Sequence, residues 1–122
     1  MIISNSALDS VKTLIITIGA SPAELRGAQA GVLPPTYVAA QSGCSDVYNR
    51  QVFKKSSFHC PTSAITVQVS NVDRPDETTD ADWVDVPQTT ENFTNTDWTF
   101  RWFRIKGTDN AKVFVNSVDS RY

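Results

Sequence analysis

The segment Ile65-Thr66-Val67-Gln68-Val69-Ser70 decides the fold class, because apolar and polar residues alternate through it. A period of two residues is that of an extended strand with one buried face and one exposed face. β-branched residues at most positions strengthen this preference. We therefore expect a strand over residues 65–70, with Ile65, Val67 and Val69 pointing into a core.

C-terminal to this strand, the same reasoning predicts further strands. Trp83-Val84-Asp85-Val86 is expected to form a short one that ends at Pro87, because proline cannot donate a ladder hydrogen bond. Residues 98–106 are rich in aromatic side chains and end at Gly107, and alternation resumes over residues 111–115. These last two segments are predicted to form a β-hairpin.

The N-terminal half carries one clear strand. Residues 22–36 have no sustained helical period, so we expect a loop there, with at most a single helical turn around residues 23–26. Residues 11–18, in contrast, are predicted to form a strand with three apolar side chains on one face, those of Leu14, Ile16 and Ile18.

Two further segments, residues 37–40 and 46–53, have strand character, and no segment offers a convincing amphipathic helix. Short strands separated by turn signals indicate an antiparallel β-sandwich or jelly roll with little or no helix. A chain of 122 residues can bury one core of its own. We therefore expect a single all-β domain over residues 1–122, with residues 1–10 as an N-terminal arm and residues 116–122 as a C-terminal tail.

Charge and hydropathy argue against several classes of partner. Residues 1–61 carry three acidic and five basic side chains, whereas residues 62–122 carry ten acidic and six basic ones, for a net charge of −2. Neither half clusters lysine and arginine as a phosphate-reading surface does, so nucleic acid is not an expected partner. No apolar run approaches the ~18 residues that would cross a bilayer, so we expect no membrane partner. The N-terminus lacks a secretory pattern, so we expect synthesis in the cytoplasm.

Groups that could carry catalysis are few. The single histidine, His59, precedes Cys60, and neighbours on an extended chain point to opposite faces. His59 is therefore poorly placed to activate that thiol, and His59, Cys44 and Cys60 are too few for a structural zinc site. We expect no enzyme activity, no catalytic residue and no cofactor. We also expect free thiols, because a disulfide would not persist in a reducing cytosol.

The most polar stretch runs from Val72 to Asp82 and holds five acids against one base. We expect it to be a solvated loop. Asp76, Asp80 and Asp82 could supply oxygen ligands to calcium, although the loop lacks the spacing of an EF-hand and contains a proline. The simpler interpretation is a charged loop that keeps a sheet edge solvated and discourages edge-to-edge pairing.

Residues 98–104 interleave four aromatic side chains with Arg101 and Arg104. If exposed, they would form a stacking platform for sugars or bases. If buried, at least half of them would fill the core, with Phe103 and Ile105 facing inward and Trp102 and Arg104 on the opposite face. We expect Trp102 to be the residue most readily presented to a partner. The candidate partner or glycan contacts are Trp83, Trp98, Trp102, Arg104 and Tyr122.

Three runs in the C-terminal half carry a resemblance: residues 65–71 (ITVQVSN), residues 82–86 (DWVDV) and residues 100–106 (FRWFRIK). Their progression resembles that of discoidin-like, galactose-binding-like β-sandwiches. It is also similar to small structural proteins of tailed bacteriophages, whose equivalent strand is matched here by Ser63 to Ser70. The resemblance covers about residues 62–115 and implies a β-sandwich. The acidic loop replaces the tight Asp-Gly turn of that progression, and no sugar-binding residues are carried over.

This resemblance implies a non-enzymatic bacteriophage virion protein, either a capsid decoration or cement protein or a head–tail accessory subunit. Its expected partners are major capsid or tail proteins and copies of itself, contacted through residues 1–10, 27–36 and 116–122. Its expected location is the virion. The alternative is a carbohydrate-binding adhesion module, on a phage tail or a similar surface, that binds a host-surface glycan.

Overall fold

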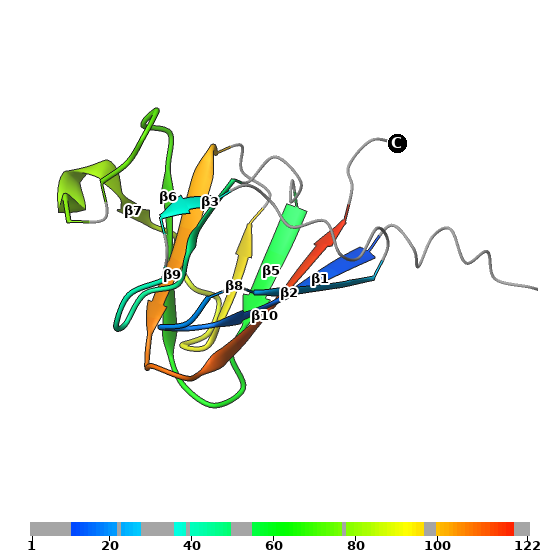
Figure 1. Ribbon diagram of the computed structural model, residues 1–122. Coiled ribbons are helices and arrows are strands. Elements are labelled where there is room, and N and C mark those ends of the chain that lie inside the picture. Colours follow the sequence, from blue (N-terminus) through cyan, green and yellow to red (C-terminus); the bar gives the residue numbers. More distant parts are fainter. Residues whose placement is uncertain are drawn as a thin grey trace, which may run out of the picture.

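The computed structural model describes residues 11–21, 23–27, 36–38, 40–49, 55–76, 78–96 and 100–118. Within these ranges the strands form two five-stranded antiparallel sheets that face each other across a shared core (Figure 1). This confirms the predicted all-β sandwich. The strands are β1 (Val11–Thr17), β2 (Glu24–Gly27), β3 (Thr36–Val38), β4 (Val47–Asn49), β5 (Lys55–His59), β6 (Ile65–Ser70), β7 (Val84–Asp85), β8 (Phe93–Thr96), β9 (Trp102–Gly107) and β10 (Lys112–Val118).

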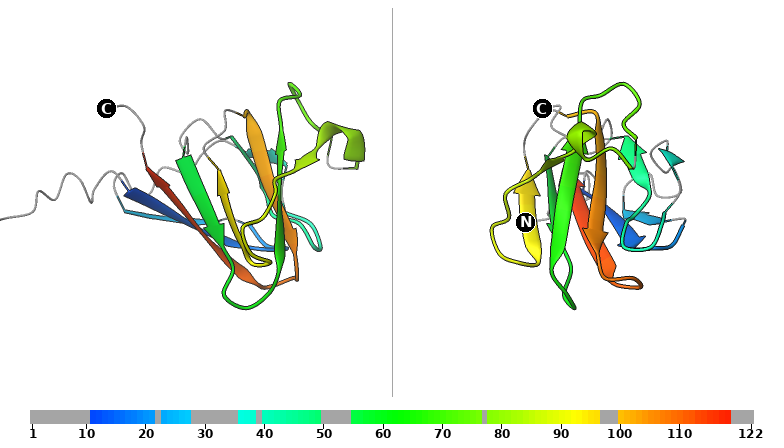
Figure 2. Two further views of the ribbon diagram at one scale, coloured as in Figure 1. Left: turned by 180° about the vertical axis from the view of Figure 1, so that it is seen from behind. Right: turned by 90° about the vertical axis from the view of Figure 1, so that its left-hand side faces the viewer.

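The two sheets divide the strands in an order that the sequence does not follow. Sheet A has the order β2-β1-β10-β5-β8, and sheet B has the order β3-β4-β9-β6-β7. The views of Figure 2 show them as two layers, with the single short 3-10 helix η2 (Asp80–Asp82) of the described residues lying beyond sheet B. The acidic loop that contains this helix therefore lies on the side of sheet B that faces away from sheet A.

The core lies where the alternation in the sequence places it. Ile65, Val67 and Val69 of β6 are buried, as predicted. Leu14, Ile16 and Ile18 are buried as well, which confirms the predicted strand over residues 11–18, seen here as β1 and the residue that follows it.

Phe103 of β9 links the two sheets at the centre of this core. Its ring centroid lies 5.4 Å from that of Tyr48 on β4, in a stacked arrangement, and 6.3 Å from that of Phe100. From sheet A, the ring of Phe58 approaches it edge-on at 5.5 Å. Aromatic pairs in these geometries stabilise by about 0.5–1.5 kcal/mol each beyond their area of burial.

The predicted hairpin of residues 98–106 with residues 111–115 is wrong. β9 pairs with β6 in sheet B, where Val67 lies opposite Ile105, whereas β10 pairs with β1 in sheet A. The connection between them crosses from one sheet to the other, as the orange-to-red segment of Figure 1 shows. Alternation identifies a strand and its buried face, but it does not identify the neighbouring strand.

Other boundaries also differ from the prediction. The expected loop or helical turn at residues 22–36 contains strand β2, because its backbone pairs with β1. The expected tail at residues 116–122 starts too early, since Asn116 to Val118 belong to β10 and pair with both β1 and β5. The predicted arm, residues 1–10, lies outside the described residues. So do residues 28–35 and 50–53 and most of the predicted tail, residues 119–122.

Gly19 makes the tight turn that follows β1. Its φ of 81° lies in the left-handed region that favours glycine. A Cβ at this position would lie 2.5 Å from Oδ1 of Asp109. That carboxylate accepts hydrogen bonds from the Gly43 amide (2.6 Å) and the Ser42 hydroxyl (2.8 Å), so it cannot move without losing both. The Asp109 carboxylate therefore ties the β9–β10 connection to the turn at Ser42 and Gly43.

We predict that Gly19→Ala lowers the free energy of unfolding by about 2 kcal/mol, from backbone strain plus the clash with Asp109. Chemical denaturation measures this loss. Gly43→Ala is the matched control, because its φ is 79° but the nearest atom to its Cβ is 3.7 Å away. An equal loss in both variants would contradict a role for the Asp109 contact.

A second prediction concerns pH. The Gly43 amide and the Ser42 hydroxyl donate to Asp109 and hold the pKa of its carboxyl below the ordinary value of 3.8. A lowered folded-state pKa adds stability above pH 3.8, and this stability is lost as the pH falls through the folded-state pKa. Wild type should thus be more stable than Asp109→Asn at neutral pH, and the gap should close in acid. Thermal melts across this range would contradict the assignment if the gap were constant.

Candidate functional site

Three of the predicted contact residues, Trp83, Trp102 and Arg104, come together on the outer face of sheet B. On β9, Phe103 and Ile105 enter the core, so Trp102 and Arg104 point to the opposite face, as the alternation predicts. Trp83 directly precedes β7. The indoles of Trp83 and Trp102 pack with Val47 of β4 in a second, smaller apolar cluster.

Arg104 is the charged centre of this face. Its guanidinium carbon lies 4.3 Å from the centroid of the Trp83 ring, and its Nε donates to Oε1 of Gln68 at 2.8 Å. Nε2 of Gln68 in turn donates to Oδ1 of Asp85 at 2.8 Å. Arg104, Gln68 and Asp85 lie directly opposite one another on β9, β6 and β7, so their alignment follows from the register of these strands. The indole face and the amide oxygen thereby stabilise a cation that is only 2% exposed.

The expectation that Trp102 is presented to a partner is wrong. The residue is 8% exposed, and Trp83 is 6% exposed. The physical reason is that the acidic loop folds back, so that Trp83 covers an outward face that the strand pattern alone assigns to solvent. Trp98 and Tyr122 lie outside the described residues.

Trp83 holds the C-terminal end of the acidic loop, which is taken here with its two flanking residues as Asn71–Trp83. Nε1 of this indole donates to the Asp76 carbonyl oxygen at 3.1 Å. The Asp76 amide donates to Oδ2 of Asp82 at 2.8 Å, which closes the loop around η2. The Asp76 carboxylate accepts from both the amide and the hydroxyl of Thr78 at 2.9 Å, and these bonds lower the pKa of Asp76.

These contacts bear on the calcium hypothesis for Asp76, Asp80 and Asp82. Two of the three carboxylates accept hydrogen bonds from loop amides. Across the part of the chain that the structure describes, no three or more His, Cys, Asp or Glu side chains group into a set that could hold a metal ion.

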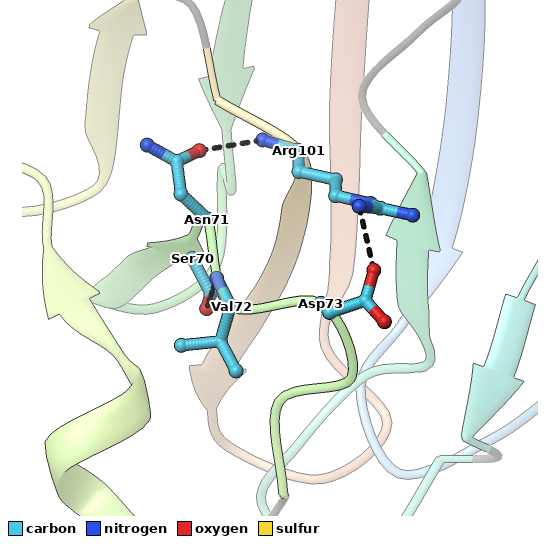
Figure 3. A network of polar contacts seen from close by, with 5 residues as sticks. All are labelled: Ser70, Asn71, Val72, Asp73 and Arg101. Carbon is cyan, nitrogen blue, oxygen red and sulfur yellow. Dashed lines mark hydrogen bonds and ion pairs between the residues drawn. The ribbon is translucent and has the colours of Figure 1, made fainter.

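The N-terminal end of the loop is attached to Arg101, just before β9 (Figure 3). The Arg101 amide donates to Oδ1 of Asn71 at 3.0 Å and to the Ser70 carbonyl at 3.2 Å. The Arg101 guanidinium pairs with Asp73 at 2.8 Å, while the Ser70 hydroxyl accepts from the Val72 amide at 3.1 Å. An exposed ion pair contributes little, typically below about 1 kcal/mol. The hydrogen bonds that the Arg101 amide donates to Asn71 and Ser70 therefore carry most of this attachment.

We call residues Asn71–Trp83 the clamped loop, since both of its ends are attached to sheet B. What it leaves accessible is acidic and partly apolar: the side chains of Asp73, Asp76 and Asp80 are exposed. Val72, within the loop, and Val84, directly after it, are 43% and 61% exposed, and they are the exposed large hydrophobic residues of the described part of the chain. The accessible surface of the clamped loop and of the residue after it thus combines carboxylates with two valine side chains.

The cysteines and the histidine lie apart from this surface. His59 is exposed and Cys60 is buried, as expected for neighbours on a strand, and both cysteines are free. Burial by itself would raise the pKa of the Cys60 thiol, but hydrogen bonds with Ser63 and Thr62 outweigh it and hold that pKa below its usual value.

No family model, no curated protein and no solved structure matches this chain. The described segments include no helix that is both long enough and apolar enough to cross a membrane.

Sequence reasoning missed Gln68, Asp85 and Asn71 as parts of this site. Gln68 and Arg104 both fall on outward positions of segments predicted as strands, which is a usable signal. Their pairing was hidden because the same reasoning assigned residues 98–106 to a hairpin with residues 111–115 instead of to the strand over residues 65–70.

We predict that Trp83→Leu releases the clamped loop. The change removes the ring over Arg104 and the bond to Asp76, and it should lower the free energy of unfolding by about 3 kcal/mol. A protease that cuts at aspartate should then cleave within residues 73–82 faster than in wild type.

Val84→Thr is the matched control, because it alters an exposed neighbour and should leave loop cleavage unchanged. Equal cleavage rates in wild type and Trp83→Leu would show that Trp83 does not hold the loop.

Proposed function

We propose that this protein is a non-enzymatic virion structural protein of a tailed bacteriophage, a capsid decoration or head–tail accessory subunit. It would be made in the host cytoplasm and act in the virion. Its partners would be major capsid or tail proteins and copies of itself. Support comes from the resemblance of residues 62–115 to small phage structural proteins and from a β-sandwich that carries a fixed, exposed acidic loop.

The attachment of the clamped loop is the observation that carries this proposal. An unattached loop loses conformational entropy when a partner orders it, at roughly 1–2 kcal/mol per residue of backbone. Here the Trp83 indole, the Asp82 carboxylate and the Asn71 amide side chain already fix the loop before any partner is bound. Binding energy from Val72, Val84 and the carboxylates is therefore available for affinity.

Contact of this kind stabilises a particle by mass action. A subunit that binds only the assembled shell shifts the equilibrium toward assembly, and many copies multiply the effect. The exposed carboxylates favour a basic partner surface, and such steering weakens as salt screens it.

The carbohydrate-binding alternative depended on a stacking surface made by Trp83, Trp98 or Trp102. Trp83 and Trp102 are buried against Val47 and Arg104, and Trp98 lies outside the described residues. The described tryptophans thus offer no open ring face for a sugar.

The proposal predicts that the purified chain binds assembled capsids or tails of its own phage and that mass spectrometry finds it in purified virions. Asp80→Lys should weaken this binding by about tenfold, because it reverses a charge on the exposed part of the loop. Glu91→Lys is the matched control, with the same charge change on an exposed residue outside the loop. Virions without the chain, together with no binding to particles, would contradict the proposal.

A further inference from the structure

Strand β8 contributes threonines to the core between the two sheets. It is an edge strand of four residues whose neighbour in sheet A is β5 (yellow in Figure 1). Its inward side chains are those of Thr94 and Thr96, whereas β1 and β10 bury aliphatic side chains such as Leu14 and Val115. The strand therefore gains less from apolar burial than its neighbours in the sheet do.

Both threonine hydroxyls are buried without a hydrogen-bond partner. Thr94 is 0% exposed and Thr96 is 5% exposed, and neither Oγ1 atom forms a hydrogen bond. The residues directly opposite them on β5, Phe58 and Ser56, are buried as well. A hydroxyl in such a position loses the hydrogen bonds that it would make to water if the strand were open. Both threonines therefore destabilise the closed position of β8.

The chain is attached to the sandwich on both sides of these threonines. On the N-terminal side, the Phe93 carbonyl oxygen accepts hydrogen bonds from the amides of Thr89 and Thr90, at 3.1 and 3.2 Å. On the C-terminal side, Phe100 is buried in the core and its ring packs edge-on against Phe103. The segment between these two attachments can move without breaking either of them.

We propose that residues 94–96, which we call the strap, detach from β5 while the rest of the sandwich stays folded. A segment with few buried apolar contacts opens at a lower free energy than the whole domain unfolds. Each opening makes β5 the edge strand of sheet A and uncovers its backbone groups that face β8. The strap is separate from the clamped loop, so this inference does not rest on the proposed function.

Strand β5 contains an internal reference for this opening. Backbone amides of a strand in an antiparallel sheet point alternately to its two neighbours. The Cys60 amide, directly after β5, donates to the Asn92 carbonyl oxygen on the β8 side at 3.0 Å. The Phe58 amide, two residues earlier, therefore points toward the strap, whereas the Ser57 amide points toward β10. Opening of the strap exposes the Phe58 amide and leaves the Ser57 amide bonded.

Native-state hydrogen exchange, measured by NMR on the full chain, tests the proposal. After correction for intrinsic rates, we expect the Phe58 amide of wild type to exchange about a hundredfold faster than the Ser57 amide. The Phe58 rate should also stay nearly constant in low concentrations of denaturant, because local opening exposes little new surface. Equal rates, or an equal dependence on denaturant, would show that both amides exchange through the same opening and would overturn the proposal.

Two valine variants test the cause of the opening. Thr94→Val and Thr96→Val each replace a buried hydroxyl with a methyl group, so the Phe58 amide should exchange about tenfold more slowly in each. Thr66→Val is the matched control, because Thr66 is half-buried on the outer face of β6 and should leave this rate unchanged. Unchanged or faster exchange in both strap variants would show that the hydroxyls do not weaken the strap. The comparison of Phe58 with Ser57 uses wild type alone, so it decides the proposal even if a valine variant does not fold.

Discussion

A buried guanidinium needs partners, and the arrangement of the outer face of sheet B follows from how Arg104 finds them. Removing such a cation from water without compensation costs several kcal/mol. The Trp83 ring covers it and Gln68 accepts from it, with Asp85 behind Gln68. Because Trp83 also donates to the Asp76 carbonyl, the position of the ring sets the position of the loop. The C-terminal end of the clamped loop therefore depends on one buried arginine.

Strand β9 connects this surface to the core. It is the central strand of sheet B, between β4 and β6. Its inward residue Phe103 contacts aromatic rings of both sheets. On its outward side, Trp102 belongs to the second apolar cluster and Arg104 contacts Trp83, which holds the clamped loop. The core residue Phe103 and the residue Arg104, which contacts Trp83, therefore lie on the same strand, and this strand fixes the loop relative to the whole sandwich. Such rigidity would favour the binding that we propose, because the loop would not have to be ordered when a partner binds.

The sequence was sufficient to predict the strands β1 and β6, their buried faces and the all-β class, because an extended chain places every second side chain on the same face of a sheet. It was also sufficient to predict that Trp102 and Arg104 share an outward face. Burial of that face could not be predicted, because it depends on Trp83, which lies 19 residues before Trp102 in the chain and reaches the face only through the fold of the loop. The polar strands β5 and β8 lack a periodic signal, as Lys55-Ser56-Ser57 and Thr94-Asn95-Thr96 illustrate. Pairing with β10 makes β5 a strand, and pairing with β5 in turn makes β8 one.

The central claim, that Arg104 and Trp83 together hold the loop, is tested most directly by a double-mutant cycle. Unfolding free energies of wild type, Trp83→Leu, Arg104→Met and the double variant give the coupling between the two side chains. A cation–π contact with a desolvated arginine should couple them by about 1–2 kcal/mol in favour of the intact pair. A coupling energy indistinguishable from zero would show that the two residues stabilise the protein independently and that Arg104 does not hold the clamped loop through Trp83.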